Sequence, residues 1–175
     1  MTTARTANLL GAVTLGMTDA LRAACFGALE HGGETAAALA TIGLEPGLTN
    51  QRLSRILGLS HPGVVRLVDK LVAEGAVERR SHRDDARAVA LHLTAAGQDC
   101  RARLLARRRH ALVSVIERLS RREQAQLAAL LEKILLELPR DEMHAHAICR
   151  LCEEQACKNC PVERAFAISA GASPG

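Results

Sequence analysis

Apolar residues recur at three- and four-residue steps through most of this chain, a spacing typical of amphipathic helices. The steps predict a helix over 8–30 and a short one over 35–42, separated by the break at 31–34. Further stripes predict two long helices after residue 93, the second of which ends at Pro139. The chain is therefore expected to fold mainly as helices.

The middle of the chain has a shorter and more varied pattern. Thr49 and Ser60 are residues that cap helix N-termini, and Gly58 between them ends the first of two short helices. Residues 77–80 and 88–93 alternate as short strands do, and the polar loop between them predicts a hairpin. Two short helices followed by a hairpin form a winged helix-turn-helix. The expected fold class is mainly α, with a small β-hairpin wing and long N- and C-terminal helices.

The second short helix carries polar and basic residues on the side opposite its apolar stripe. In a helix-turn-helix this side enters the major groove of duplex DNA. Arg66 has the geometry to bond both O6 and N7 of guanine, and Ser60 at the helix N-terminus suits a backbone phosphate. The expected DNA-binding residues of this helix are Ser60, His61, Gly63, Arg66 and Lys70.

The predicted hairpin concentrates arginines at and around its tip. A narrow minor groove has an enhanced negative potential and attracts an inserted arginine. Asp85 stands two residues before Arg87, close enough to orient its guanidinium. The expected DNA-binding residues of the hairpin are Arg79, Arg80, Arg83, Asp85 and Arg87.

Two stretches of the chain resemble the MarR family of bacterial transcription regulators. They are "LTNQRLSRILGLSHPGVVRLVDKLVAEGAVERR" at 48–80 and "DARAVALHLTAAG" at 85–97. The family's wing pattern, D-x-R followed by L-T-x-x-G, is present here as Asp85, Arg87, Leu93, Thr94 and Gly97. We take the resemblance to extend over residues 8–138.

The resemblance implies a sequence-specific regulator that binds double-stranded DNA, more often a repressor than an activator. It implies a homodimer whose first and last two helices intertwine, so that two recognition helices meet a pseudo-palindromic operator about one DNA turn apart. It also implies that a small-molecule effector, a metal or a redox signal changes the DNA affinity. The expected division is a dimerisation helix at 1–34, a DNA-binding lobe at 35–97, dimerisation helices at 98–139, a cysteine-rich metal-binding tail at 140–165 and a flexible C-terminus at 166–175.

Four cysteines follow the last of the predicted long helices, in the spacing C-x2-C-x4-C-x2-C: Cys149, Cys152, Cys157 and Cys160. Two C-x-x-C pairs this close indicate soft-metal ligation, and four thiolates close a tetrahedral zinc site. An iron–sulfur cluster is the alternative, because the last three cysteines form a C-x4-C-x2-C triplet followed by Pro161. A metal-free thiol switch is the third hypothesis. His144 and His146 lie nearby, but four cysteines suffice.

The place of this segment, directly after the predicted dimerisation helices, suggests a regulatory hypothesis. The segment would lock or sense the arrangement of the dimer. A metal that binds one arrangement more tightly than another biases DNA affinity by that difference.

Absent residue types and motifs argue against other classes of function. Because Phe26 and Phe166 are its only aromatic residues, the chain lacks the stacking platforms that single-stranded DNA and RNA binding use. It has no G-x-S-x-G, H-E-x-x-H, phosphate-loop or Rossmann motif, so we do not expect an enzyme. The alternatives are a cysteine-centred electron-transfer protein and an interaction module that does not bind DNA.

Simpler sequence patterns predict the cellular location and the role of the two remaining cysteines. No apolar run approaches the length of a membrane span, and no clean cleavage site ends the apolar stretch near the N-terminus. We therefore expect a cytoplasmic protein with no membrane partner and with reduced thiols. Cys25 and Cys100 are interpreted as small apolar residues. The basic run at 106–110 is interpreted as a solvated helix face rather than a nucleic-acid patch.

Overall fold

The computed structural model describes residues 2–26, 32–81, 89–153, 156–157 and 159–165. The expected fold class is confirmed: within the described residues the chain is mainly helical, with one two-stranded antiparallel hairpin. The elements in chain order are α1 (Thr3–Phe26), α2 (Gly32–Leu44), α3 (Asn50–Leu57), α4 (His61–Ala73), β1 (Val77–Ser81), β2 (Val89–Leu93), α5 (Ala95–Ile116), α6 (Arg121–Glu137) and α7 (Glu142–Cys149).

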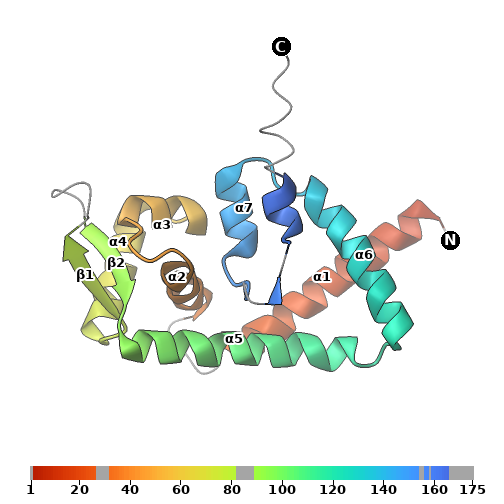
Figure 1. The fold of residues 1–175 in the computed structure, drawn as a ribbon, viewed down its shortest axis with the longest axis horizontal. Helices are drawn as coiled ribbons and strands as arrows, with labels where there is room; N and C mark the ends of the chain where they lie inside the picture. Colours follow the sequence, from red (N-terminus) through yellow and green to blue (C-terminus); the bar gives the residue numbers. More distant parts are fainter. Residues whose placement is uncertain (1, 27–31, 82–88, 154–155, 158, 166–175) are drawn as a thin grey trace, which may run out of the picture.

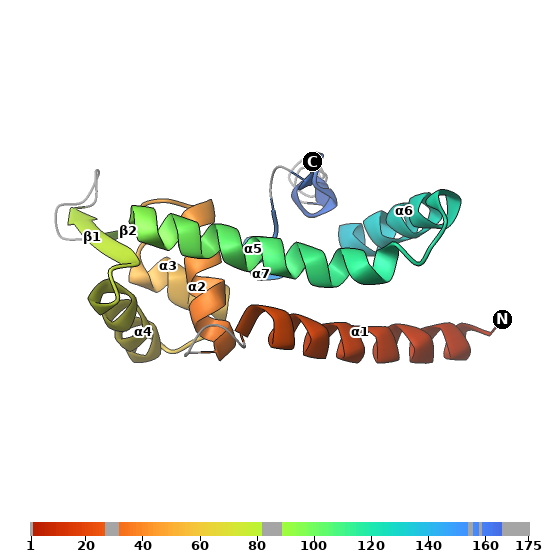
Figure 2. The ribbon, with the colours of Figure 1, turned by 90° about the horizontal axis from the view of Figure 1, so that it is seen from below.

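The elements divide the molecule into two ends joined by α5. Figure 1 shows the hairpin with α3 and α4 at one end, and α6 with the start of α1 at the other. Helix α5 runs along the whole length between them, and α1 lies beside it, as Figure 2 shows from below. No helix of the described residues has both the length and the apolarity that a membrane crossing needs.

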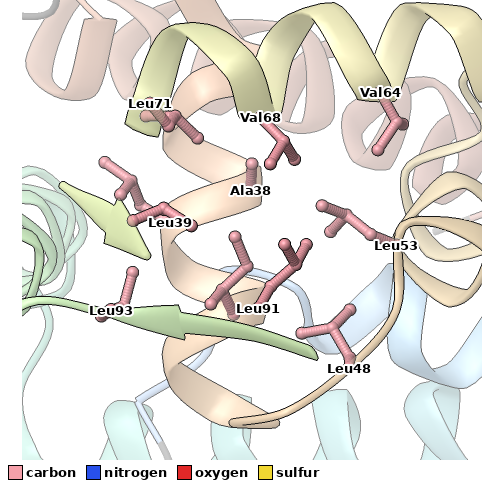
Figure 3. Packing of buried hydrophobic residues seen from close by; sticks show 11 residues of the cluster. Ala38, Leu39, Leu48, Leu53, Val64, Val68, Leu71, Leu91 and Leu93 are labelled. Carbon is pink, nitrogen blue, oxygen red and sulfur yellow. The ribbon is translucent and has the colours of Figure 1, made fainter. Parts of the chain in front are cut away.

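The lobe that is expected to bind DNA is held by one apolar core in which α2, α3, α4 and the hairpin meet (Figure 3). Leu39 of α2, Leu53 of α3, Val68 of α4 and Leu91 of β2 are at most 1% exposed. Burying a leucine or valine side chain of this kind stabilises a fold by about 1.5–3 kcal/mol. This shared core therefore holds α3 and α4 in a fixed position against the hairpin.

A backbone pairing joins the hairpin to the loop before α3. Leu91 accepts a hydrogen bond from the Gly47 amide at 2.8 Å and donates one to the Leu48 carbonyl at 3.0 Å. On its other side β2 pairs with β1, in a register that sets Arg79 opposite Leu91. Strand β2 thus lies between β1 and residues 47–48, which anchors the wing to the core.

Local signals place both short helices where the sequence predicts them. The Thr49 hydroxyl accepts a hydrogen bond from the Arg52 amide at 3.2 Å and caps α3. Gly58 ends α3 with a φ of 66°, a left-handed conformation that glycine adopts without steric cost. Ser60 caps α4 in the same way as Thr49 caps α3, with Pro62 in the first turn.

Two details of the predicted helices are wrong. The break expected over 31–34 does not extend beyond residue 31, because α2 already begins at Gly32. Glycine is tolerated there since the first helical turn has no intrahelical partners for its N–H groups in any case. Helix α7 was not predicted, although Asp141 caps it by accepting a hydrogen bond from the His144 amide at 2.7 Å.

The division into domains stays a prediction. Its first boundary, between residues 34 and 35, falls inside α2, and its last segment, 166–175, lies outside the described residues. The segments predicted for dimerisation, 1–34 and 98–139, would be defined by their contacts with a second chain.

Gly97 provides a test of the junction between the hairpin and α5. A Cβ at this position would overlap the carbonyl oxygen of Ala76, which already accepts the Thr94 amide at 3.1 Å. Because that neighbour is backbone, it cannot swing aside. We expect Gly97→Ala to lower the free energy of unfolding by about 1–3 kcal/mol or more, measured by urea denaturation.

Gly16→Ala is the matched control, since it adds the same methyl group inside α1 with no neighbouring atom within 4 Å. Alanine is the better helix former, so this variant should be unchanged or more stable by up to about 1 kcal/mol. Equal stability of Gly97→Ala and the unaltered protein would contradict the proposed steric role.

Candidate nucleic-acid interface and cysteine site

Helix α4 presents its polar side to solvent, as expected of a recognition helix. Val64, Val68 and Leu71 are buried, whereas His61 and Arg66 are exposed on the other side of the helix. Lys70, also predicted to contact DNA, is half-buried near the end of the helix. The cationic side chain of Arg66 would therefore be accessible to the bases if α4 entered the major groove of DNA.

The start of α4 is where the sequence predicts a backbone phosphate to bind. The Ser60 hydroxyl accepts a hydrogen bond from the Gly63 amide at 3.2 Å, so it already serves as the helix cap. A side chain at Gly63 would lie 3.1 Å from that hydroxyl oxygen, which explains a small residue at this place. A phosphate would then be attracted by the helix N-terminus and its remaining amides.

Two of the predicted wing residues are held by neighbouring carboxylates. Arg79 of β1 forms an ion pair with Asp69 of α4 at 2.5 Å, and Arg80 pairs with Glu78 on its own strand. The first pair joins the wing to the recognition helix at the surface. Exposed pairs of this kind contribute about 0–1 kcal/mol, so they orient the guanidinium groups more than they stabilise the fold.

The predicted tip of the wing, with Arg83, Asp85 and Arg87, lies outside the described residues, and its role stays a prediction. The strands that lead to it are described, and Ser81 of β1 pairs with Val89 of β2 at their ends.

The structure brings all four clustered cysteines to one cavity of about 650 Å³. Cys149 is the last residue of α7, and its carbonyl accepts a hydrogen bond from the Cys152 amide at 2.8 Å. Cys160 is buried, whereas Cys157 is exposed, and all four are free thiols. Residues 140–165, which carry them, are called the cysteine lobe below.

The thiols influence one another's protonation. A hydrogen bond from the Cys149 thiol lowers the pKa of Cys152 to about 6, with help from the charge of Arg108 and against the effect of burial. The same hydrogen bond raises the pKa of Cys149, and burial raises it further. Burial and the neighbouring Cys160 raise the pKa of Cys157. The site thus favours one thiolate hydrogen-bonded to a protonated neighbour.

The donor set fits a soft metal, but its geometry is not that of a formed metal centre. Thiolates are the preferred ligands of zinc and of iron–sulfur clusters. Among the described residues, no group of three or more histidine, cysteine, aspartate or glutamate side chains converges on one point as metal ligands do. All four cysteines line one cavity.

The cavity reaches α3, the first helix of the helix-turn-helix, a feature that sequence reasoning missed. Arg52 of α3 lines it, donates to Glu142 of α7 at 3.4 Å and lies 3.1 Å from the Nε2 atom of His146. Glu45, just before α3, completes the group by an ion pair with Arg52. Ninety residues of chain separate Arg52 from Glu142, so no local signal connects them. The only sequence feature that indicates a helix at this place is Asp141, a residue type that caps helix N-termini.

The basic run on α5 also faces the cysteine lobe in part. Arg109 forms an ion pair with Glu153 at 2.5 Å, and the charge of Arg108 acts on Cys152. The interpretation of residues 106–110 as a purely solvated face is therefore incomplete. Cys25 and Cys100 pack against apolar clusters, as small apolar residues do.

Solved structures of transcription regulators have a similar fold. Streptococcus pneumoniae FabT in complex with DNA matches with a TM-score of 0.61 and 24% identity, over 74% of this chain and 92% of that one. Wild-type apo MarR from E. coli matches with a TM-score of 0.61 and 24% identity, over 77% and 98%. A MarR family protein of Mycobacterium tuberculosis is 27% identical with a TM-score of 0.58, over 73% and 91%.

Residues 16–88 match the family model described as the MarR family, whereas no curated protein matches the chain. The matched residues include α2, α3, α4 and β1, and they end before α5 and the cysteine lobe. This match confirms the resemblance drawn from the helix-turn-helix and the wing. The chain therefore contains a segment that matches the MarR-family model, and it has the winged-helix fold of these structures.

Proposed function

We propose that the protein is a transcription regulator that binds double-stranded DNA through α4 and the wing. The observation that carries this proposal is the recognition helix itself, which seats Val64 and Val68 in the core and exposes Arg66. Helix α4 lies within the residues that match the MarR-family model, and FabT, which has a similar fold, was solved in complex with DNA. The guanidinium of Arg66 is the best candidate for reading a guanine.

A homodimer is part of the proposal, because most of the apolar face of α6 stays exposed among the described residues of one chain. None of its residues is buried, and Leu130 is 58% exposed. Exposed apolar residues also lie on α1 and at the end of α5: Leu9, Leu10, Val13, Leu15, Val113, Val115 and Ile116. Figure 1 shows the start of α1 and the end of α5 at the same end of the molecule as α6. Apolar surface of this extent favours association. A second copy related by a two-fold axis would present paired recognition helices to a pseudo-palindromic operator.

Repression, controlled by a small-molecule effector, is the mode of action that we propose. A MarR family protein of Mycobacterium tuberculosis that is 26% identical was solved with p-aminosalicylic acid, which supports an effector of small size. We assign no catalytic role to the chain. The proposed place of action is the cytoplasm, where the operator is and where thiols stay reduced.

The DNA-binding proposal predicts a specific loss in Arg66→Ala. A duplex selected by the unaltered protein from a random pool should bind this variant at least about fivefold more weakly, because a bidentate contact to guanine is lost. For the unaltered protein, affinity should fall steeply as salt concentration rises. Fluorescence anisotropy at several salt concentrations measures both effects.

Arg122→Ala is the matched control, since it removes the same charge from an exposed position on α6. It should bind the selected duplex as the unaltered protein does. Failure of the unaltered protein to enrich any duplex, even at low salt, would refute the proposed function.

The dimer proposal predicts that a charge on the apolar face of α6 separates the subunits. Leu130→Glu should lower the molar mass in light scattering from two chains towards one, because the carboxylate would be desolvated at the interface. Ala129→Glu adds the same group at an exposed position on the opposite side of α6 and should leave the dimer intact. A monomeric unaltered protein would contradict the proposal.

A structural metal at the cysteine lobe is a separate proposal. It is supported by the presence of Cys149, Cys152, Cys157 and Cys160 in the lining of one cavity and by their chemistry as soft ligands. Zinc is the first candidate, because four thiolates form a closed tetrahedral site. An iron–sulfur cluster is the alternative, and a metal-free thiol switch is the third.

Anaerobically purified protein should contain one zinc ion per chain and be colourless. Cys157→Ser should lose the metal, since it removes a ligand at an exposed position that the fold tolerates, whereas Cys100→Ser should retain it. Elemental analysis and an absorption spectrum are the measurements. A brown protein with charge-transfer bands would support an iron–sulfur cluster instead of zinc. A protein without metal would support the thiol switch.

A further inference from the structure

The cysteine lobe contacts the DNA-binding lobe directly, and not only the helices proposed to form the dimer. Helix α7 lies between α3 and α6 in Figure 1, and it packs against α3. The contact is polar: Arg52 of α3 meets Glu142 and His146, one turn apart on α7. Because the Arg52 side chain is only 33% exposed, its position depends on these partners.

The same lobe is anchored to the other half of the molecule. Leu151, between the first two clustered cysteines, packs against the buried cluster of Cys25, Ala36, Ala40 and Leu104, which joins α1, α2 and α5. Glu153 pairs with Arg109 of α5. Leu135 of α6 packs against the apolar cluster of Ala145, Cys160 and Val162 inside the lobe.

These contacts make the cysteine lobe a bridge between two parts that must be aligned. The distance between two recognition helices on DNA is fixed by the helical repeat, roughly 34 Å for one turn. In a dimer that distance depends on how each DNA-binding lobe sits relative to the dimerisation helices. A segment that contacts α3 on one side and α5 and α6 on the other controls this placement.

We propose that metal binding by the four cysteines fixes α7 against Arg52 of α3 and thereby holds the DNA-binding lobe in the orientation that operator binding requires. Cys149 ends α7, one turn after His146, so a ligand held by Cys149 restrains the helix that contacts Arg52. The inference rests on the proposed function and on the proposed metal. It differs from sensing at the dimer interface, because the path runs within one subunit.

The direction of the effect follows from preorganisation. A lobe held in one orientation loses less conformational freedom when two recognition helices dock together, so the metal-bound protein binds more tightly. The expected change is a fivefold or greater increase in affinity for the selected duplex on adding Zn²⁺ to the metal-free protein.

The test compares Arg52→Ala with Arg55→Ala in the full-length protein. Both variants remove one arginine from α3, so the general attraction to DNA falls equally. Among the described residues, however, Arg55 is exposed and forms no hydrogen bond or ion pair with α7. Zinc should raise duplex affinity at least fivefold in the unaltered protein and in Arg55→Ala. In Arg52→Ala the zinc-loaded and zinc-free affinities should agree within twofold, although zinc still binds.

Hydrogen exchange of the α3 amides provides a second measurement that needs no DNA. Zinc should slow exchange over residues 50–57 at least threefold in the unaltered protein and in Arg55→Ala, and should not do so in Arg52→Ala. Glu142→Lys breaks the contact from the α7 side, at a side chain that is 67% exposed, and should behave like Arg52→Ala. It replaces that variant if Arg52→Ala does not fold.

Each outcome separates the inference from the proposed function. Equal DNA binding with and without zinc, together with unchanged α3 exchange, overturns the inference and leaves the DNA-binding regulator standing. An undiminished zinc effect in both Arg52→Ala and Glu142→Lys also overturns it, as does a chain that binds no zinc. Zinc-dependent protection of α3 without binding to any duplex supports the bridge and refutes the proposed function.

Discussion

The packing of Leu91 against the helix pair is the contact on which the proposed DNA-binding face depends. Leu91 belongs to the hairpin, yet its side chain lies in the core with Leu53 and Val68 (Figure 3). The recognition helix and the wing are therefore positioned by one buried cluster rather than by two. The ion pair between Arg79 and Asp69 adds a surface link between the same two elements.

The sequence predicts this lobe well because its boundaries are set locally. The caps Thr49 and Ser60 and the left-handed Gly58 act within a few residues of themselves, and the structure places each as expected. The alternation of the hairpin strands is also encoded within one short stretch. The physical reason is that hydrogen bonds of helix ends and hairpins join near neighbours in the chain.

The cysteine lobe shows the limit of such local reasoning. Spacing alone predicts that the four thiols gather, and they do. It does not predict that α7 places Glu142 beside Arg52, because that contact joins residues 90 positions apart. The contact between α5 and the cysteine lobe could not be predicted for the same reason. Nothing near Arg109 in the sequence points to Glu153, and only tertiary packing brings the two side chains together.

The pairing of β2 with residues 47–48 has a consequence for the solubility of the wing. It covers one side of the small sheet, so that among the described residues only the outer side of β1 lacks a backbone partner. An open strand edge invites strands of other molecules to add to it, and charged side chains discourage that addition. Glu78, Arg79 and Arg80 belong to this edge strand. The charges of Arg79 and Arg80, which we propose for nucleic-acid contact, would therefore also discourage edge-to-edge aggregation.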